Sequence, residues 1–117
     1  MKKVLYAASM LLMVLLLLPE PADARNVFRI SNQTGKTITY LYVSHSGTDS
    51  WEEDVLSPEV LNIRTLENGY YCEVNLDRAD TYDLKAIFRD GSEHEYYDIE
   101  VRRYRGVTLY RNEAEYQ

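Results

Sequence analysis

The stretch Thr81–Val101, TYDLKAIFRDGSEHEYYDIEV, decides the fold class of this chain. Its first half alternates apolar and polar residues, and this period of two is typical of a strand with one buried face. The apolar positions are Tyr82, Leu84, Ala86 and Phe88. Asp90-Gly91 gives the signal of a two-residue hairpin turn. A second strand is expected over 94–101, with an apolar face formed by Tyr97, Ile99 and Val101. The stretch therefore predicts an antiparallel hairpin.

Further strand signals lie on both sides of this hairpin. Short strands are expected from Val27 onward, over 70–76 and over 106–111. Residues 37–43 are rich in β-branched and aromatic side chains, with apolar residues on both faces, which indicates a central strand. The segment 60–66 alternates only weakly and favours either a short strand or an extended loop.

The turns and the C-terminal end complete this outline. Asn68-Gly69 is a hairpin turn signal, and 112–117 has the composition of a frayed polar tail. After residue 25 no segment keeps a helical period for three turns, and the best helix candidate is one turn near Ser50–Leu56. We therefore predict an all-β chain, a single small antiparallel β-sandwich of about 6–7 strands.

The N-terminus has the order of a secretory signal peptide. Lys2 and Lys3 precede an apolar run of 15 residues, Val4–Leu18, and Ala22-Asp23-Ala24 follows as a cleavage site. A membrane-spanning helix needs about 20 apolar residues, so this run is short for an anchor. We expect residues 1–24 to be cleaved. The remaining domain, residues 25–117, is expected to be periplasmic or secreted, with no membrane association.

Charge and cysteine content exclude several classes of function. The chain has a net charge of −6 at pH 7, whereas nucleic acids and anionic membrane surfaces both require a basic face. Cys72 is the only cysteine and lies far in sequence from His45 and His94. Because a nucleophilic thiol requires a neighbouring base, we expect Cys72 to be a small buried apolar residue rather than a catalytic one. It is either free or paired between chains.

Several separated segments carry a resemblance to a known family. "LYVSHSGTDSWEEDVLSPEVL" follows the pattern L-Y-V-S-x-S, W-x-x-D-x-L and V-L, and "YDLKAIFRDG" follows D-L-[KR]-x-x-[FY]-x-D-G. "DIEVRRYRGVTLY" matches the last two strands of the same pattern. Over most of residues 27–111 the chain thus resembles an uncharacterised family of small exported bacterial β-domain proteins. The resemblance implies a compact β domain in the cell envelope and implies no reaction.

One departure from that family concerns a disulfide. Its members commonly carry two cysteines that look able to pair, one three residues before D-L and one directly after the D-[LI] of the next strand. In this chain these positions hold Asp80 and Glu100, and Cys72 does not replace either. The resemblance therefore implies a domain that lacks the cross-strand bridge of its relatives, a bridge worth about 2–4 kcal/mol.

The acidic loop after strand 37–43 is the first candidate site. If the predicted strands run simply up and down, one end of the sandwich carries the loop 45–57, the connection 77–80 and the turn 102–105. Calcium takes about 6–8 oxygen ligands, and the candidates for it are Asp49, Glu52, Asp54, Asp77 and Asp80. The arginines at the same end (Arg78, Arg102, Arg103 and Arg105) favour a surface ion-pair network instead. Calcium is thus the weaker alternative, and no other cofactor is expected.

Trp51, the only tryptophan, has two interpretations. In the favoured one it caps the open end of the sandwich beside Leu56. In the other it is an exposed platform for a sugar or a peptide, assisted by Tyr40 or Tyr42.

No catalytic motif, phosphate loop or nucleophile elbow is present in the sequence. The expected function is that of a non-catalytic module of the envelope, with a structural role or with binding to an envelope protein or glycan. The alternative is a calcium-dependent binding module.

Overall fold

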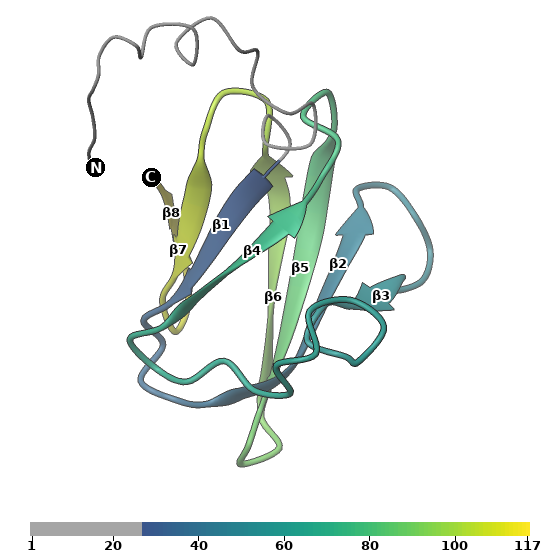
Figure 1. The fold of residues 1–117 in the computed structure, drawn as a ribbon. Coiled ribbons are helices and arrows are strands. Elements are labelled where there is room, and N and C mark those ends of the chain that lie inside the picture. Colours follow the sequence, from purple (N-terminus) through teal and green to yellow (C-terminus); the bar gives the residue numbers. More distant parts are fainter. Residues whose placement is uncertain (1–26) are drawn as a thin grey trace, which may run out of the picture.

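The computed structural model describes residues 27–117, which form two four-stranded sheets packed face to face (Figure 1). The predicted signal peptide lies outside the described residues. Every regular element within 27–117 is a strand. Over the same span, no helix is long and apolar enough to cross a membrane. The prediction of a small all-β sandwich is confirmed.

The first sheet has the order β4-β1-β7-β8. Its strands are β4 (Tyr71–Asn75), β1 (Val27–Asn32), β7 (Gly106–Leu109) and β8 (Ala114–Tyr116). The β1–β7 pair is parallel, which departs from the purely antiparallel prediction, whereas β1–β4 and β7–β8 are antiparallel. The parallel pair requires a glycine where β7 begins, because a Cβ at Gly106 would collide with the carbonyl oxygen of Arg29.

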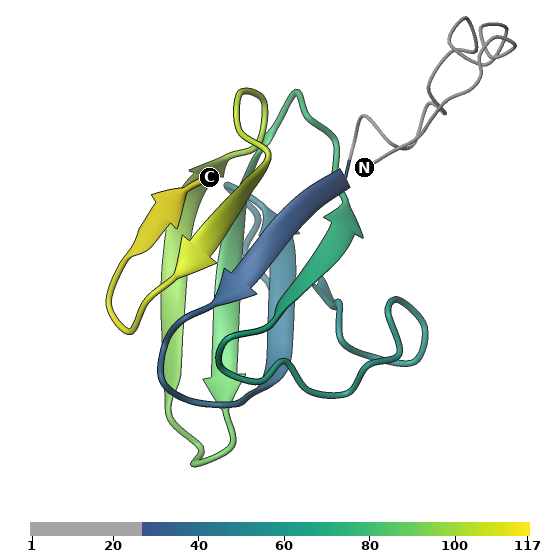
Figure 2. The same ribbon diagram turned by 60° about the vertical axis from the view of Figure 1, so that its left-hand side comes forward.

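The second sheet has the order β3-β2-β5-β6 and is antiparallel throughout. Its strands are β3 (Glu53–Asp54), β2 (Ile38–His45), β5 (Thr81–Phe88) and β6 (Glu93–Glu100). β2 lies between β3 and β5, as its mixed apolar pattern predicts. Figure 2 shows the chain crossing repeatedly between the sheets, with β1 in one layer and β2 in the other.

The β5–β6 hairpin forms as predicted, with one extra loop residue. The Phe88 N–H donates to the Ser92 carbonyl over 2.8 Å, so three residues, Arg89 to Gly91, form the loop. Gly91 has a φ of 88°, which fits the left-handed position of a three-residue loop that ends in a bulge. The two-residue turn expected from Asp90-Gly91 is therefore wrong by one residue.

A β-bulge changes which residues of β6 are buried. The register shifts between Tyr82 and Leu84, and Asp98 on the opposite strand has a φ of 58°. Its N–H donates to Asp83 Oδ1 over 2.9 Å. The extra residue reverses the side-chain alternation, so Tyr96 is buried and Tyr97 is 58% exposed. The expectation that Tyr97 shares the inner face with Ile99 is wrong.

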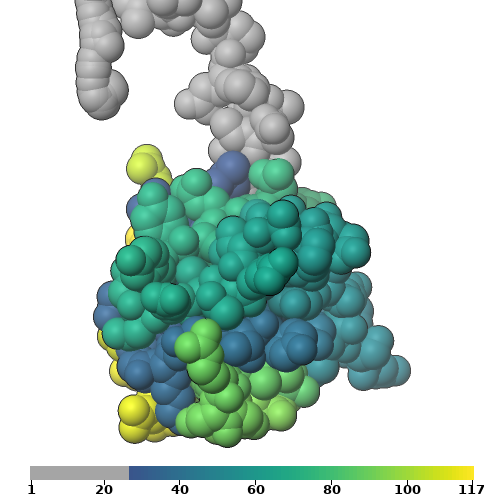
Figure 3. All heavy atoms as spheres, turned by 60° about the horizontal axis from the view of Figure 1, so that its bottom comes forward, coloured from purple at the N-terminus to yellow at the C-terminus, as the bar shows by residue number. Residues whose placement is uncertain are grey.

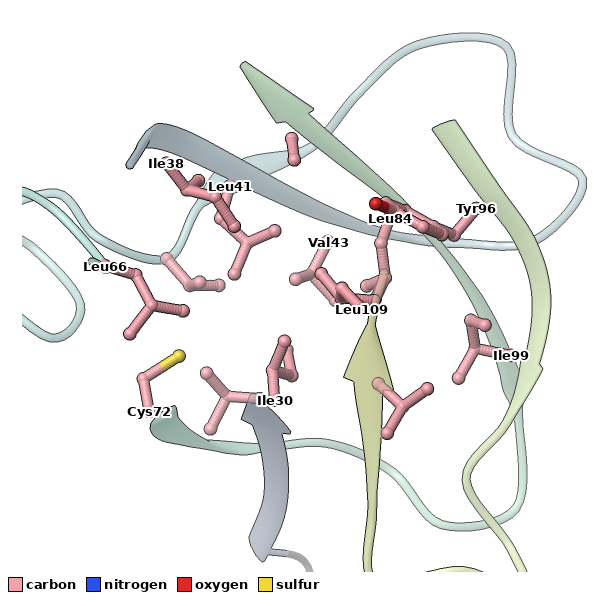
Figure 4. Packing of buried hydrophobic residues seen from close by; sticks show 14 of the residues in the cluster. Ile30, Ile38, Leu41, Val43, Leu66, Cys72, Leu84, Tyr96, Ile99 and Leu109 are labelled. Atoms are coloured by element: carbon pink, nitrogen blue, oxygen red, sulfur yellow. The ribbon is translucent and has the colours of Figure 1, made fainter. Parts of the chain in front are cut away.

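The core fills the space between the two sheets (Figure 4). Leu41, Val43 and Leu84 of the second sheet face Ile30 and Leu109 of the first. Cys72 is buried in this core, as predicted, and it forms no disulfide within residues 27–117. Its burial, with a smaller contribution from Glu73, raises the pKa of the thiol to about 12.

The connection from β3 to β4 covers the lower end of the sandwich, where Figure 3 shows it beside the β5–β6 hairpin. It begins with hydrogen-bonded turns and meets β2 of the second sheet at two places. The Val55 N–H donates to the Leu41 carbonyl over 2.9 Å, and Leu66 forms an isolated bridge with Ile38. Because β4 pairs with β1, Asn68-Gly69 does not join a hairpin. Asn62 and Arg64 adopt positive φ values of 56° and 67° in this loop. Residues other than glycine rarely adopt this left-handed backbone conformation.

Two further expectations are corrected by the strands at the ends of the sheets. The helical turn near Ser50–Leu56 does not form, because Glu53 and Asp54 pair with Val43 and Tyr42 as strand β3. The tail 112–117 is not frayed, because β8 pairs with β7 and the Gln117 side chain donates to the Val107 carbonyl over 3.1 Å. The pairing partner of such a short segment is set by tertiary structure.

Candidate functional site

The loop between β2 and β3, residues 46–52, is held by hydrogen bonds at both ends. The Ser46 N–H donates to the Thr81 carbonyl over 3.0 Å, and the Thr48 hydroxyl donates to the His45 carbonyl over 2.9 Å. At the other end the Glu52 N–H donates to the buried Ser44 Oγ. The loop is thus fixed against the sheet, and it determines where Trp51 lies.

His45 connects this loop to the β4–β5 connection. Its Nδ1 lies 3.2 Å from Glu52 Oε1 and its Nε2 lies 3.5 Å from Asp80 Oδ2. Its ring packs on Tyr82 with a centroid distance of 4.7 Å. The hydrogen bond from the His45 backbone N–H, followed by that from its side chain, lowers the pKa of Glu52. The predicted gathering of loop 45–57 and connection 77–80 at one end of the sandwich is confirmed.

Trp51 does not cap the core. Leu56 is fully buried in the core, whereas Trp51 is half-buried and is not part of the core or of the side chains packed on it. β3 begins two residues after Trp51, and this pairing directs Val55 and Leu56 inward. The Trp51 ring instead lies on the outer side of the second sheet, where Lys85 Nζ is 5.8 Å from the ring centroid. The favoured interpretation of Trp51 as a cap is wrong.

A hollow of about 170 Å³ opens beside Trp51. We call it the Trp51 hollow. Its walls come from the loop 46–52 and from the outward-facing residues of three strands, and they combine aromatic, acidic and hydroxyl side chains: Ser44, Thr48, Asp49, Ser50, Trp51, Asp83, Glu95 and Tyr97. A concave surface with an aromatic wall and a few convergent polar groups is the usual composition of a ligand site.

The hydrogen bonds of the hollow hold its acidic wall in place. Asp83 Oδ1 accepts from the Ser46 hydroxyl and from the Asp98 N–H, each over 2.9 Å. Glu95 accepts from the Tyr97 hydroxyl, and this bond raises the pKa of Tyr97. All three donors are neutral, so these bonds orient the carboxylates without neutralising their charge.

Two of the predicted platform residues, Tyr40 and Tyr42, lie on β2 and stack on each other. Their ring centroids are 6.3 Å apart and nearly parallel, and Tyr40 is 49% exposed. Neither lines the Trp51 hollow. Tyr97 does line it, and sequence reasoning missed this residue because the regular alternation of β6 assigned it to the core. The bulge at Asp98 left no signal in the sequence.

The five calcium candidates do not converge. Asp54 Oδ1 accepts from the backbone N–H groups of Leu41 and Leu56, and Asp77 Oδ1 accepts from the Ala79 N–H. Of the five, only Glu52 and Asp80 come together, at His45. Among residues 27–117 no group of three or more acidic, histidine or cysteine side chains is arranged to hold a metal ion.

The expected arginine network is also reduced to one contact. Arg102 lies 3.5 Å from Glu100. Arg78 donates to the backbone carbonyls of Val27 and Tyr104 over 3.2 and 3.1 Å, so it joins the start of β1 to the β6–β7 turn rather than neutralising a carboxylate.

The composition of the Trp51 hollow is the basis for any functional assignment, because the comparisons with known proteins supply none. The resemblance to the exported β-domain family stays a prediction. No family model, no curated protein and no solved structure matches this chain.

Proposed function

We propose that this chain is an exported, non-catalytic binding module of the cell envelope, and that its ligand stacks on Trp51 in the Trp51 hollow. The observation that carries the proposal is the position of the single tryptophan. A large aromatic ring is held half-buried on the outer face of a sheet, beside polar side chains and away from the core. Such a ring offers a flat contact surface for a sugar or a peptide.

The rigidity of the loop supports a binding role. Hydrogen bonds at Ser46, Thr48 and Glu52 hold the loop 46–52 in place before any ligand arrives. A preformed site loses less conformational entropy on binding than a flexible one. Export is inferred from the signal-peptide pattern of residues 1–24, and it makes an envelope glycan or protein the partner that the module would meet.

A non-catalytic role is favoured by the chemistry of the walls. Neither histidine lines the hollow, so it lacks the side chain that most often acts as a general acid or base. The calcium-dependent alternative has less support, because its candidate ligands have separate partners. Melting the protein with calcium and with a chelator tests that alternative. A calcium site filled at 100 times its dissociation constant would add about 2.7 kcal/mol to the unfolding free energy, and we expect no change.

The emission of Trp51 tests the binding proposal directly, because no other tryptophan contributes. We expect a change in this emission on titration with envelope saccharides or peptides, and loss of binding in Trp51→Ala. The matched control is Tyr70→Ala, which removes an aromatic ring that is 64% exposed elsewhere on the surface. Full binding by the Trp51→Ala protein would contradict the assignment of the site.

A further inference from the structure

The Trp51 hollow carries more negative charge than its surroundings neutralise. Asp49, Asp83 and Glu95 all line it, and no ion pair within residues 27–117 involves any of the three. The cation beside the Trp51 ring, Lys85, forms its ion pair with Glu93 instead, at 3.1 Å. A concave acidic surface of this kind concentrates the electrostatic field and attracts a positively charged ligand.

Each of these carboxylates keeps free acceptor capacity. A carboxylate has about four lone-pair positions. Asp83 uses its Oδ1 for two neutral donors, and Glu95 uses its Oε1 for one. The Asp49 side chain has no hydrogen bond to any other described residue. Asp49 and Glu95 are therefore available to an incoming ammonium group, whereas Asp83 also holds the bulge of β6.

The buried hydroxyl of Ser44 provides an independent observation. Ser44 is only 2% exposed and lines the hollow. Its Oγ accepts the Glu52 N–H, but its hydroxyl hydrogen has no acceptor among residues 27–117. A buried donor without an acceptor costs free energy unless a ligand or water satisfies it. A ligand with a positive charge and an acceptor oxygen would therefore complement both the carboxylates and the Ser44 hydroxyl of the hollow.

We propose that the Trp51 hollow binds an amino sugar in its cationic form. The ring of the sugar stacks on Trp51, its ammonium group lies between Asp49 and Glu95, and one of its oxygens accepts from the Ser44 hydroxyl. The inference rests on the proposed binding function and specifies its ligand class. The volume of the hollow, about 170 Å³, is below the usual range for drug-sized ligands and suits a single sugar ring.

The test compares two trimers of the same length, one of glucosamine and one of N-acetylglucosamine, by Trp51 emission and by calorimetry. Acetylation removes the positive charge and keeps the ring. We expect the glucosamine trimer to bind at least about tenfold more tightly, as for the loss of a charge-assisted hydrogen bond. This preference should decrease as salt concentration rises.

Variants separate the charge of the hollow from the charge of the whole protein. Asp49→Asn and Glu95→Gln should each reduce the preference for the glucosamine trimer while the melting temperature stays within about 2 °C. Glu59→Gln is the matched control, because it removes the same charge at an exposed position outside the hollow and should leave the preference unchanged.

The outcomes distinguish this inference from the function on which it rests. Equal affinity for the two trimers would overturn the role of charge and leave saccharide binding intact. Binding of trilysine without binding of either trimer would overturn the assignment of a sugar as the ligand. The protein would then be a peptide-binding module. If none of the three ligands changes Trp51 emission or releases heat, the inference fails, and only a different partner would preserve the binding function.

Discussion

At the scale of single residues, Trp51 and Leu56 lie five positions apart and belong to different environments. We expect Leu56→Ala to lower the unfolding free energy by about 2–5 kcal/mol, because it leaves a cavity in the core. Trp51→Ala should cost about 1 kcal/mol or less, since the ring packs on an outer face and loses chiefly its contact with Lys85. Urea denaturation of the two variants measures both values. Similar decreases in unfolding free energy for the two variants would show that Trp51 packs on the core.

The second residue-scale prediction concerns the buried thiol of Cys72. The pKa of this thiol is raised from 9.0 to about 12 in the folded protein. The unfolded chain therefore releases the proton first, so the stabilising contribution is complete below pH 9 and is lost as the pH rises toward 12. The pKa of Tyr96 is also raised, from 10.0 to about 12, so Tyr96 contributes to the loss of stability only above pH 10. Between pH 9 and 10 the decrease in stability should thus come mainly from Cys72.

Two measurements check the role of Cys72. In Cys72→Ala, the slope of unfolding free energy against pH between 9 and 10 should fall by up to about 1.4 kcal/mol per pH unit. In the parent protein, a thiol reagent should react slowly with the native state and fast in denaturant. Fast reaction of the native protein would show that the thiol is accessible.

At the scale of elements, the β3–β4 loop holds strain at Arg64. A residue with a side chain at a positive φ costs about 1–2 kcal/mol, whereas glycine does not. Glycine also costs about 0.4–1 kcal/mol by adding entropy to the unfolded chain. We therefore expect Arg64→Gly to leave stability unchanged or raise it by about 1 kcal/mol. Glu59→Gly, in the same loop without a positive φ, should lower it by about 0.4–1 kcal/mol. If thermal melts show Arg64→Gly to be less stable than Glu59→Gly, the backbone at Arg64 is not strained.

At the scale of the whole molecule, β8 closes one edge of the first sheet. Deleting residues 113–117 removes three backbone pairs with β7, the stack of Tyr116 on Tyr104 and the side-chain bonds of Gln117. We expect a loss of at least about 2 kcal/mol and self-association through the exposed edge of β7. Tyr116→Phe is the milder control, because it removes only the bond to the Glu100 N–H and should cost about 0.5–1.5 kcal/mol. A monomer of unchanged stability after the deletion would mean that the tail does not pair.

The sequence predicts those parts of the fold in which local pattern and tertiary contact agree. The alternation from Tyr82 to Phe88 is strong, and β5 is the strand that it describes. The parallel pairing of β1 with β7 has no local signal, because its two strands are separated by most of the domain. The bulge at Asp98 is likewise set by its bond to Asp83, and it moved Tyr97 from the expected core to the candidate site.

The candidate site is predicted in part for the same reason. Trp51 and Asp49 are in the loop that composition singles out, but Asp83 and Glu95 come from strands whose outward faces resemble any solvated surface. A tryptophan is compatible with a core and with a platform, so its residue type alone does not decide between them. The start of β3 two residues later decides it, and a pairing of only two residues is too short to detect in advance.

The parallel contact between β1 and β7 also determines the order in which the domain can fold. A chain is synthesised from its N-terminus, so β1 emerges early, whereas its neighbour β7 is not available until residues 106–109 have been made. The second sheet needs only residues 38–100 and can assemble before that point. Until β7 arrives, one long side of β1 is exposed. β1 is therefore the segment of the nascent chain that most needs protection from aggregation until synthesis is complete. Either a chaperone or a soluble unfolded state can provide that protection.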